Sequence, residues 1–237
     1  MKRRYAVIAF VALAGVAAAQ TVPLPRPRPF LHSDEAAPAA KLAAVPTPSA
    51  CRLRLTAARA IAPAVTSIDG PEGCGGVDLV RLEAAMLSNN DRVEINPPAV
   101  LRCEMAEAVA DWVRDDLSEL AVVYFGSRLR SVRNYTAYNC RSRNNIVGAL
   151  PSEHGKGNAL DVGSITLVNG RTVDPTDPKV SRDFRERWKK SACARYSTVL
   201  GPGSDGYHEN HVHLDIKERQ NGYRICQWEI RVADESP

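Results

Sequence analysis

The six cysteines of this chain limit its folding more than any other feature of the sequence. No two of them form a CxxC pair, which argues against a thioredoxin motif or a zinc ribbon. An even number of scattered cysteines is typical of structural disulfides in an exported protein, and buried free thiols are the alternative. The residues do not select one pairing. The simplest expectation is nearest-neighbour pairing: Cys51 with Cys74, Cys103 with Cys140, and Cys193 with Cys226.

The N-terminal residues 1–19 have the layout of a secretory signal peptide. Met1 to Arg4 is a short basic cap, and Tyr5 to Ala19 is an uncharged, mostly apolar run that ends in alanines. This run is shorter than the roughly 20 apolar residues that a bilayer-spanning helix needs, so cleavage is favoured over an uncleaved membrane anchor. The chain is therefore expected to be exported to the periplasm or cell envelope, where disulfides form.

Charge argues against one class of partner, and composition divides the rest of the chain into a linker, a domain and a tail. The formal net charge of +4 includes Lys2, Arg3 and Arg4, so most of the positive charge leaves with the signal peptide and gives no case for nucleic acid binding. Residues 20–50 are rich in proline and alanine, which predicts an extended linker without a core. Residues 51–228 have the composition and length of one globular domain, and residues 229–237 form a tail.

Hydrophobic patterns within the domain predict an α+β fold, because helical spacing of apolar residues is mixed with strand-like alternation. An Asn-Gly pair also predicts a hairpin with positive φ at both turn positions. The predicted elements are helices over 78–87, 101–122 and 179–196, strands over 128–138 (with a bulge), 159–165 and 212–216, and the hairpin turn over 168–171.

The stretch HVHLD predicts a strand with two chemically different faces. Because successive side chains of a strand point to opposite sides, His211, His213 and Asp215 share one face, and the valine and leucine between them share the other. The apolar face anchors the strand to the core. The polar face presents two imidazoles about 7 Å apart at the backbone, so that one can bind a metal while the other lies beside it.

A second stretch, SEHGKGNALDV, holds a histidine and an aspartate. Gly155 and Gly157 permit a tight chain path after His154, and Asp161 follows between apolar residues of a predicted strand. A carboxylate in that setting needs a partner, because burying an unpaired charge is costly. Two imidazoles and one carboxylate are a known catalytic zinc set with a fourth position for water, so the two stretches together predict a metal site. The alternative is that these are ordinary packed or solvated side chains.

These motifs resemble those of LAS-type zinc peptidases, which include D-Ala-D-Ala carboxypeptidases, murein endopeptidases and the related Hedgehog signalling domain. The resemblance rests on the pattern SxHxxGxAxD at residues 152–161 and on HxH at residues 211–213. A closer similarity, to the bacterial extensin-like protein C-terminal domain, covers nearly all of residues 51–228. It rests on YNCR at 138–141, SEHGKGNALDV at 152–162, TVLGPGS at 198–204 and HENHVHLD at 208–215.

The resemblance implies a LAS or Hedgehog/DD-peptidase-like fold, with a small, mainly antiparallel sheet and packed helices, and a bound Zn²⁺. It places the metal ligands at His154, Asp161 and His213. Arg141 matches the arginine that holds the substrate carbonyl or carboxylate, where a fixed cation stabilises negative charge. Ser152 is expected to support the ligands without binding the metal.

The resemblance leaves the catalytic base open. Many relatives carry an acid three residues before the last zinc histidine, and this chain has Asn210 there. Glu209 and His208 come just before it, and either reaches the water only if the chain bends before the strand. His211, the first histidine of the HxH pair, is the other candidate for base or transition-state donor.

Two functions follow from the resemblance. The first is a zinc-dependent peptidase acting on peptidoglycan stem peptides, as a DD-carboxypeptidase or cross-link endopeptidase, in which metal-bound water attacks the scissile carbonyl. The alternative is a non-catalytic, zinc-stabilised cell-wall-binding module, which the missing acid favours. A third hypothesis is that disulfides alone stabilise the domain and no metal binds. Peptidoglycan peptides are the expected partners, and membrane contact is expected only through an uncleaved signal segment.

Overall fold

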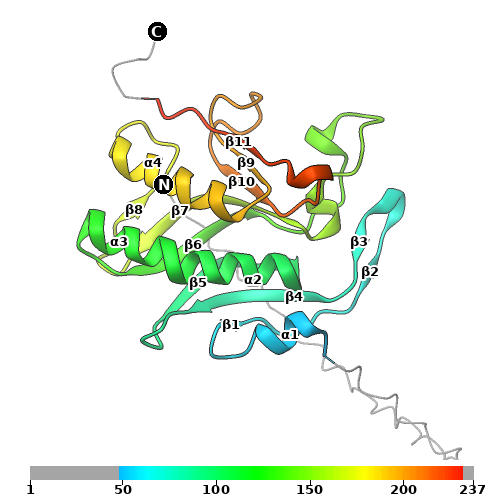
Figure 1. Ribbon diagram of the computed structural model, residues 1–237, viewed down its shortest axis with the longest axis horizontal. Helices are drawn as coiled ribbons and strands as arrows, with labels where there is room; N and C mark the ends of the chain where they lie inside the picture. Colours follow the sequence, from blue (N-terminus) through cyan, green and yellow to red (C-terminus); the bar gives the residue numbers. More distant parts are fainter. Residues whose placement is uncertain (1–47, 232–237) are drawn as a thin grey trace, which may run out of the picture. The chain divides into compact units, whose positions relative to one another are not determined.

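The computed structural model describes residues 48–231, which form one main sheet with helices packed against it (Figure 1). Within this range the sheet has nine strands in the order β1-β4-β5-β6-β7-β10-β9-β11, with β8 beside β7. Neighbouring strands are antiparallel except for β5 with β6 and β9 with β11. The strands are β1 (Ala60–Ile61), β4 (Leu79–Met86), β5 (Arg92–Arg102), β6 (Leu129–Thr136), β7 (Ala159–Leu167), β8 (Thr172–Val173), β9 (Thr198–Leu200), β10 (Val212–Asp215) and β11 (Ile225–Gln227).

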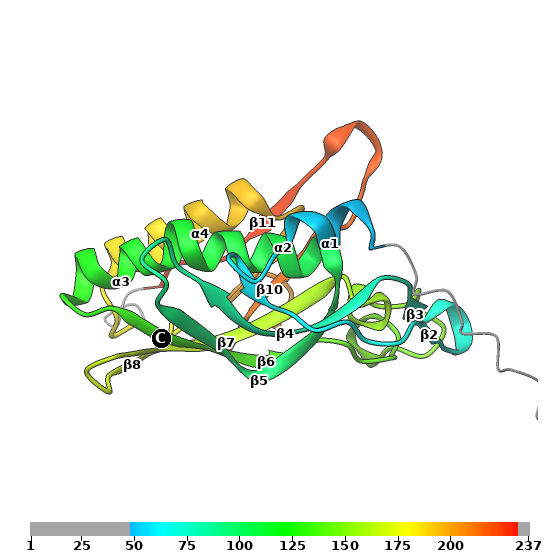
Figure 2. The ribbon, with the colours of Figure 1, turned by 90° about the horizontal axis from the view of Figure 1, so that it is seen from below.

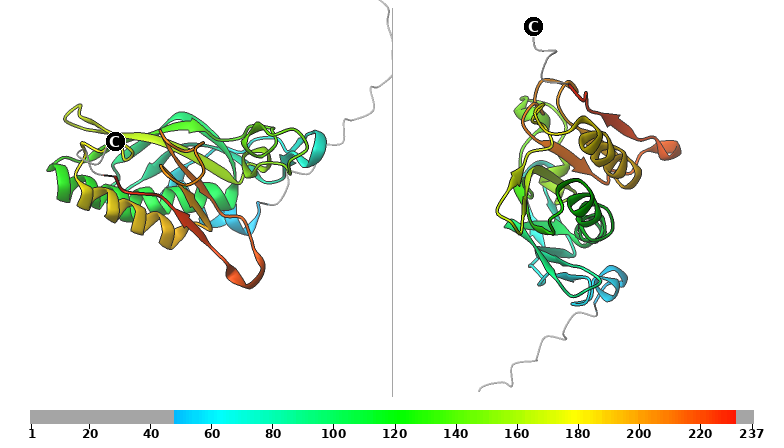
Figure 3. Two further views of the ribbon diagram at one scale, coloured as in Figure 1. Left: turned by 90° about the horizontal axis from the view of Figure 1, so that it is seen from above. Right: turned by 90° about the vertical axis from the view of Figure 1, so that its left-hand side faces the viewer.

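The helices lie on one side of this sheet. Figures 2 and 3 show α2, α3 and α4 together on the same side, so the opposite face of the sheet carries no α-helix within the described residues. The predicted α+β class, a mainly antiparallel sheet with packed helices, is thus confirmed. The helices are α1 (Ala50–Arg54), α2 (Cys103–Trp112), a π-helical stretch (Val113–Leu117), α3 (Ser118–Phe125) and α4 (Arg182–Arg195). A separate two-stranded hairpin consists of β2 (Ile68–Asp69) and β3 (Gly75–Gly76). The 3₁₀ turns are η1 (Pro71–Gly73), η3 (Arg143–Asn145), η4 (Glu153–Lys156) and η5 (Gln220–Gly222).

Aromatic side chains hold α2 against α4. The ring of Trp112 meets those of Trp188 and Tyr196 edge to face, with centroid separations of 5.4 and 5.7 Å. All three side chains are fully buried, and the indole N–H of Trp112 donates to the Ser191 hydroxyl at 2.9 Å. Large buried aromatic surfaces of this kind dominate core energetics, so this contact stabilises the packing of α2 on α4.

Most of the predicted elements are confirmed. The helix predicted over 101–122 is α2 through α3, and the helix predicted over 179–196 is α4. The strands predicted over 128–138, 159–165 and 212–216 are β6, β7 and β10. The expected bulge in β6 is also present, since its register against β7 shifts at several points.

The hairpin predicted at the Asn-Gly pair joins β7 to β8, but its turn differs from the expectation. Of the two central residues only Gly170 has a positive φ, at 86°. The side chain of Asn169 instead accepts a hydrogen bond from the backbone N–H of Arg171 at 3.0 Å. The prediction of positive φ at both positions is therefore wrong, and a side-chain-stabilised turn makes the connection.

The helix predicted over 78–87 is wrong, because these residues form strand β4. Between Leu82 and Ala84 the pairing of β4 with β5 shifts register. The shift changes which alternate positions face the core, so the fully buried residues include Leu79, Leu82 and Ala85. This spacing of three imitates one face of a helix, and pairing with two neighbouring strands outweighs the local pattern.

The disulfides join segments that are neighbours in space rather than along the chain. The bridges are Cys51–Cys103, Cys74–Cys140 and Cys193–Cys226, which leaves no free cysteine. Nearest-neighbour pairing is thus correct for Cys193 with Cys226 and wrong for the other four cysteines. The reason is topological: α1 lies beside the first turn of α2, and the β2–β3 hairpin lies beside the loop that follows β6.

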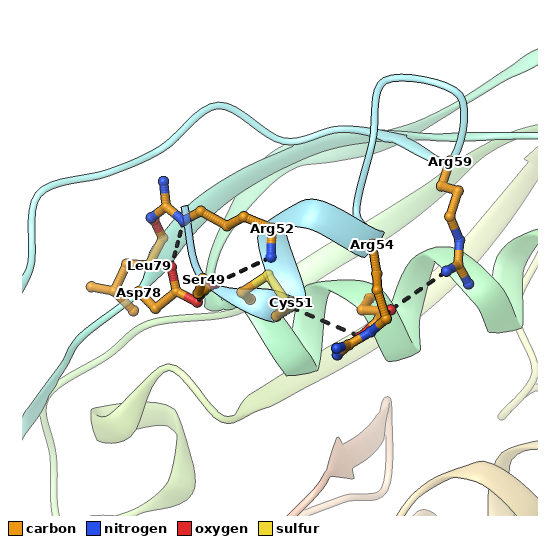
Figure 4. Close-up of a disulfide and its surroundings, with 9 residues drawn as sticks. Ser49, Cys51, Arg52, Arg54, Arg59, Asp78 and Leu79 are labelled. Atoms are coloured by element: carbon orange, nitrogen blue, oxygen red, sulfur yellow. Dashed lines mark hydrogen bonds and ion pairs between the residues drawn. A yellow bond between two sulfur atoms is a disulfide. The ribbon is translucent and has the colours of Figure 1, made fainter. Parts of the chain in front are cut away.

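Charged contacts around the first disulfide dock the N-terminal segment on the domain (Figure 4). The guanidinium of Arg52 pairs with the carboxylate of Asp78 and donates to the carbonyl of Leu79, and Arg54 pairs with Glu107 on α2. Helix α1 begins at Ala50, one residue before the expected domain boundary. Residues 1–47 and 232–237, with the expected signal peptide and most of the linker and tail, lie outside the described residues. Within residues 48–231, no helix is both long and apolar enough to cross a bilayer.

The bridge between Cys74 and Cys140 should contribute strongly to stability. It spans 66 residues of sequence, so replacing both cysteines by serine is expected to lower the free energy of unfolding by about 4 kcal/mol in a urea titration.

Peptide mapping of the unreduced protein should recover Cys51 linked to Cys103. Recovery of Cys51 linked to Cys74 would contradict the fold.

Candidate metal centre

Strand pairing places an aspartate and a histidine side by side on the face of the sheet that carries no helix. In the antiparallel pair of β7 with β10, Asp161 lies directly opposite His213. Their neighbours Val162 and Val212 are also paired and are fully buried in the hydrophobic core. Because side chains alternate along a strand, Asp161 and His213 point to the other face.

A tight turn brings His154 over this pair. Turn η4 begins after Ser152, whose hydroxyl accepts the N–H of His154 at 3.3 Å, and ends at Gly157, with φ 66°. A Cβ on Gly155 would lie 3.0 Å from the sulfur of Cys74, so the turn packs closely on the disulfide of that cysteine. The expectation that both glycines permit a tight path is confirmed, and the disulfide supports the turn.

The three predicted metal ligands come together. The Nε2 atom of His154 lies 3.1 Å from both Oδ1 of Asp161 and Nδ1 of His213, and these last two atoms are 3.0 Å apart. All three side chains are more than nine-tenths buried. Bonds of about 2.0–2.1 Å to a tetrahedral metal would hold donors about 3.3 Å apart, so the cluster has the dimensions of a metal site to within a few tenths of an ångström.

Hydrogen bonds on the far sides of the two imidazoles aim their lone pairs into the cluster. The Nδ1–H of His154 donates to the carbonyl of Ala137 at 2.8 Å, and the Nε2–H of His213 donates to the carboxylate of Asp215 at 3.1 Å. With these protons assigned from the network, Nε2 of His154 and Nδ1 of His213 are acceptors that face the carboxylate of Asp161. Three converging acceptors require a cation between them, and a metal ion meets that requirement.

Asp215 is a further candidate site residue, to which the sequence alone assigned no role beyond the face that it shares with His213. Its carboxylate accepts hydrogen bonds from the hydroxyl of Thr198 at 2.6 Å and from the backbone N–H of Lys217 at 3.0 Å, in addition to that of His213. Metal-binding histidines commonly donate their second N–H to such a carboxylate, which fixes the ring and its tautomer. The signal was present in HVHLD, where the aspartate follows the histidine on the same face of the strand.

The electrostatics of the cluster favour a negative carboxylate beside a positive charge. Burial alone would raise the pKa of Asp161, but its hydrogen bonds to His154 and His213 hold that pKa well below its usual range. Burial alone would lower the pKa of His213, but its contacts with Asp161 and Asp215 raise the pKa to about 9. Without a metal, a proton therefore takes the position of the cation, and metal binding must displace it.

The other two histidines of the second stretch form an outer layer. The Nε2 atom of His211 lies 3.7 Å from Oδ2 of Asp161, and its Nδ1 lies 2.9 Å from the amide oxygen of Asn210. Burial is the largest influence on the pKa of His211 and lowers it. The ring centroid of His208 is 5.1 Å from that of His211, and its Nδ1 lies 2.6 Å from the carboxylate of Asp205.

Of the other predicted site residues, some lie beside the cluster and one lies away from it. Arg141 and Ser152 line a cavity of about 330 Å³ that is also lined by His154 and His213. The structure does not bring Glu209 to the cluster, since one of its carboxylate oxygens accepts the N–H of Gly203 at 2.9 Å and the other pairs with Arg231 at 3.2 Å.

A second group of potential ligands lies elsewhere in the described chain. Cys51, Asp78 and Cys103 bring ligand atoms close together. Both sulfurs belong to one disulfide, so neither is a thiolate. Only the thiolate binds metal well, and the group is therefore structural in the oxidised protein.

The raised pKa of His213 predicts a pH dependence of stability in the metal-free protein. A group whose pKa rises on folding, here from 6.5 to about 9, stabilises the fold below the lower value and loses that effect as the pH passes the upper one. Chelator-treated protein should therefore lose stability between pH 6.5 and 9, with a slope of up to about 1.4 kcal/mol per pH unit. Urea titrations should show a flatter profile for His213→Gln; identical profiles would contradict the assignment.

The role of Asp215 predicts a loss of metal affinity when its charge is removed. Asp215→Asn should weaken binding about 10- to 100-fold, because the ring of His213 loses its orienting acceptor. Titration with Zn²⁺ against a competing chelator measures this. Asp205→Asn is the matched control, since it removes a similar carboxylate contact from His208, and it should leave the affinity unchanged. Equal losses in both variants would contradict the proposed ligand set.

Comparison with known proteins identifies the family of the chain. The family described as extensin-like protein C-terminus matches residues 49–227, the stretch that contains every ligand of the cluster and all three disulfides. No curated protein and no solved structure matched the chain. Because the match covers most of the sequence, the chain belongs to the extensin-like C-terminal family.

Proposed function

We propose that this domain is a zinc-dependent peptidase that acts on the stem peptides of peptidoglycan. The observation that carries the proposal is the convergence of two imidazole lone pairs and one carboxylate at the wall of an open cavity. Two imidazoles and one carboxylate suit zinc and leave a fourth position toward the solvent. When bound, zinc supplies an acidified water and polarises a carbonyl. The other requirements fall on residues of the chain.

Two arginines are available to hold a substrate. Arg141 and Arg143 line the cavity, and neither guanidinium has a hydrogen bond or ion pair within residues 48–231. The other cations of the cavity are engaged, because Lys217 faces Glu153 and Arg219 donates to Thr198. A free guanidinium beside the cluster suits the terminal carboxylate or a carbonyl of a short peptide, which it can bind through two parallel hydrogen bonds.

His211 is better placed than Glu209 to move a proton. Its Nδ1–H is directed to the amide oxygen of Asn210, which leaves Nε2 as an acceptor near Asp161. Because burial lowers its pKa, the imidazole is neutral near pH 7 and can accept a proton. Glu209 would first have to leave the backbone of Gly203 and Arg231. We therefore assign the base to His211 and keep Glu209 as the competing candidate.

A specific observation favours a second candidate function. Asn210 stands where many relatives have an acid, and Glu209 is held away from the cluster. A domain without an effective base could still use zinc for stability and bind cell-wall peptides without cleaving them. The second candidate is thus a zinc-stabilised binding module of the cell wall.

The N-terminal sequence supports action outside the cytoplasm. A basic cap and a short apolar run precede a proline-rich stretch, which suits export to the periplasm or cell envelope followed by a tether. Three disulfides in the folded part fit an oxidising compartment. Peptidoglycan is the peptide-bearing polymer that a protein in this location would meet.

The proposal predicts zinc-dependent release of D-alanine or opening of cross-linked muropeptides by the purified mature chain. Chelation and His154→Ala should each abolish turnover, because the cluster loses its metal. His211→Gln should lower kcat about 10²- to 10⁴-fold, as expected for loss of a general base, whereas Glu209→Gln should change it little. Chromatography of the digestion products gives the measurement.

Two results would count against the peptidase. Turnover that survives chelation and His154→Ala would overturn the metal mechanism. Stoichiometric zinc with muropeptide binding but no turnover would select the binding module instead. A loss of kcat in Glu209→Gln but not in His211→Gln would move the base to Glu209.

A further inference from the structure

A polar groove of about 520 Å³ lies beside the metal cluster, over β5, β6, β7 and β8. Asp161 points to the face of the sheet that carries no α-helix, and the residues that line the groove include Ser164 and Thr166 of the same strand β7. Figure 2 shows that strands β5, β6 and β7 lie side by side. Its lining is rich in hydroxyl and amide groups, with one guanidinium, one exposed aromatic ring and no carboxylate. The residues used below are Asn96, Ser131, Arg133, Asn134, Tyr135 and Ser164.

Two bulges set the ring of Tyr135 on this face. Asn134 and Thr136 pair with the consecutive residues Val162 and Asp161, so Tyr135 is an extra residue in β6. Gly163 is correspondingly an extra residue in β7, between the paired positions of Ser164 and Val162. A Cβ on Gly163 would come within 2.2 Å of the Tyr135 ring, so the ring lies directly on the backbone of β7. Bulges commonly re-aim a side chain in this way.

The ring of Tyr135 forms the link between the groove and the metal cluster. Its centroid lies 6.3 Å from that of His211, and the guanidinium carbon of Arg133 lies over the ring, 5.2 Å from the same centroid. Tyr135 remains 44% exposed, although the adjoining strand β7 buries most of its residues. The ring thus lies between the backbone of Gly163 and the guanidinium of Arg133, and its exposed part offers an apolar contact surface once the flexible arginine side chain moves aside.

The groove also contains an unused hydrogen-bond acceptor. The side chain of Asn134 is more than nine-tenths buried, and its amide N–H donates to the carbonyl of Pro97 at 3.1 Å. Its Oδ1 atom has no partner within the described residues. A buried acceptor without a donor is costly, and because this oxygen has almost no exposed surface, a sugar hydroxyl gains it as a partner only if the Asn134 side chain turns toward the groove.

We propose that this groove binds a chain of pyranose sugars, with one ring stacked on Tyr135 and the sugar hydroxyls bound by short polar side chains such as Asn96, Ser131 and Ser164. A sugar ring has an apolar C–H face and a polar rim, which matches an aromatic ring surrounded by hydroxyl and amide groups. A single arginine is too little charge for a nucleic acid backbone. A long added peptide strand does not fit here, because β6 is paired on both sides and the strand with an unpaired edge at the groove, β8, has only two residues.

The role of the groove in peptidoglycan recognition rests on the proposed peptidase function. If the stem peptide reaches the metal cluster, the sugar strand that carries the peptide can lie along the groove, with Tyr135 at the junction. The groove would then favour peptides attached to sugar over free peptides. The sugar-binding site itself requires neither metal nor turnover.

The first test is direct binding of a tetramer of β-1,4-linked N-acetylglucosamine to the full mature chain, measured by calorimetry with and without chelator. Tyr135→Ala should lower the affinity about tenfold through loss of the stacking surface, whereas Tyr135→Phe should keep it. Gly163→Ala should act like Tyr135→Ala, because its Cβ displaces the ring. Tyr223→Ala is the matched control, an exposed tyrosine outside the groove lining, and should bind normally. Unchanged zinc content in each variant reports an intact fold.

The outcomes separate this inference from the peptidase. Sugar binding that depends on Tyr135 supports the groove, even if no peptide is cleaved. Hydrolysis of a sugar-free stem peptide with no binding of the tetramer overturns the groove and leaves the peptidase intact. Equal affinities of wild type and Tyr135→Ala for the tetramer also overturn it. On a muropeptide that carries sugar, Tyr135→Ala should raise KM about tenfold, and an unchanged KM contradicts the link between groove and cluster.

Discussion

Three proton acceptors face one another at 3.0–3.1 Å inside this domain: an imidazole nitrogen of His154, an imidazole nitrogen of His213 and a carboxylate oxygen of Asp161. Such a group is repulsive unless a cation lies among its members, so either a proton or a metal ion must be present. The surrounding structure holds the acceptors in this arrangement: two paired strands carry Asp161 and His213, and a turn packed on the disulfide of Cys74 carries His154. The carboxylate of Asp215 fixes one ring.

The two faces of the sheet have different roles: one packs against the helices, and the other carries the candidate metal ligands. One face packs on α2, α3 and α4, and the aromatic side chains of α2 and α4 are buried in the core between the helices and the sheet. The other face carries no α-helix in the described chain (Figure 3). Asp161 and His213 point to it, His154 is placed over them by turn η4, and the cavity with Arg141 and the polar groove adjoin this cluster. Side chains alternate between the two faces along β7 and β10, so each strand buries aliphatic residues on one side and presents polar candidate ligands on the other. A rigid support on one face thus keeps the ligands of the other in position.

The convergence of His154, Asp161 and His213 is predictable from the sequence, whereas the pairing of cysteines distant along the chain is not. Alternation in a short strand is a local property, so HVHLD correctly indicated which side His213 faces. The partners of Cys51 and Cys74 depend on which segments pack together, which no local pattern encodes. Strand β4 was misread as a helix because a bulge disturbed its alternation. The direction of Glu209 depends on Arg231, a contact across 22 residues that its neighbours in sequence do not signal.

An anomalous-scattering map from crystals of the zinc-loaded mature chain, collected on both sides of the zinc absorption edge, tests the central claim most directly. The account predicts one strong peak about 2.0–2.2 Å from Nε2 of His154, Oδ1 of Asp161 and Nδ1 of His213. A map with no peak there, or with zinc bound only at other residues while these three donors share a proton, would contradict it.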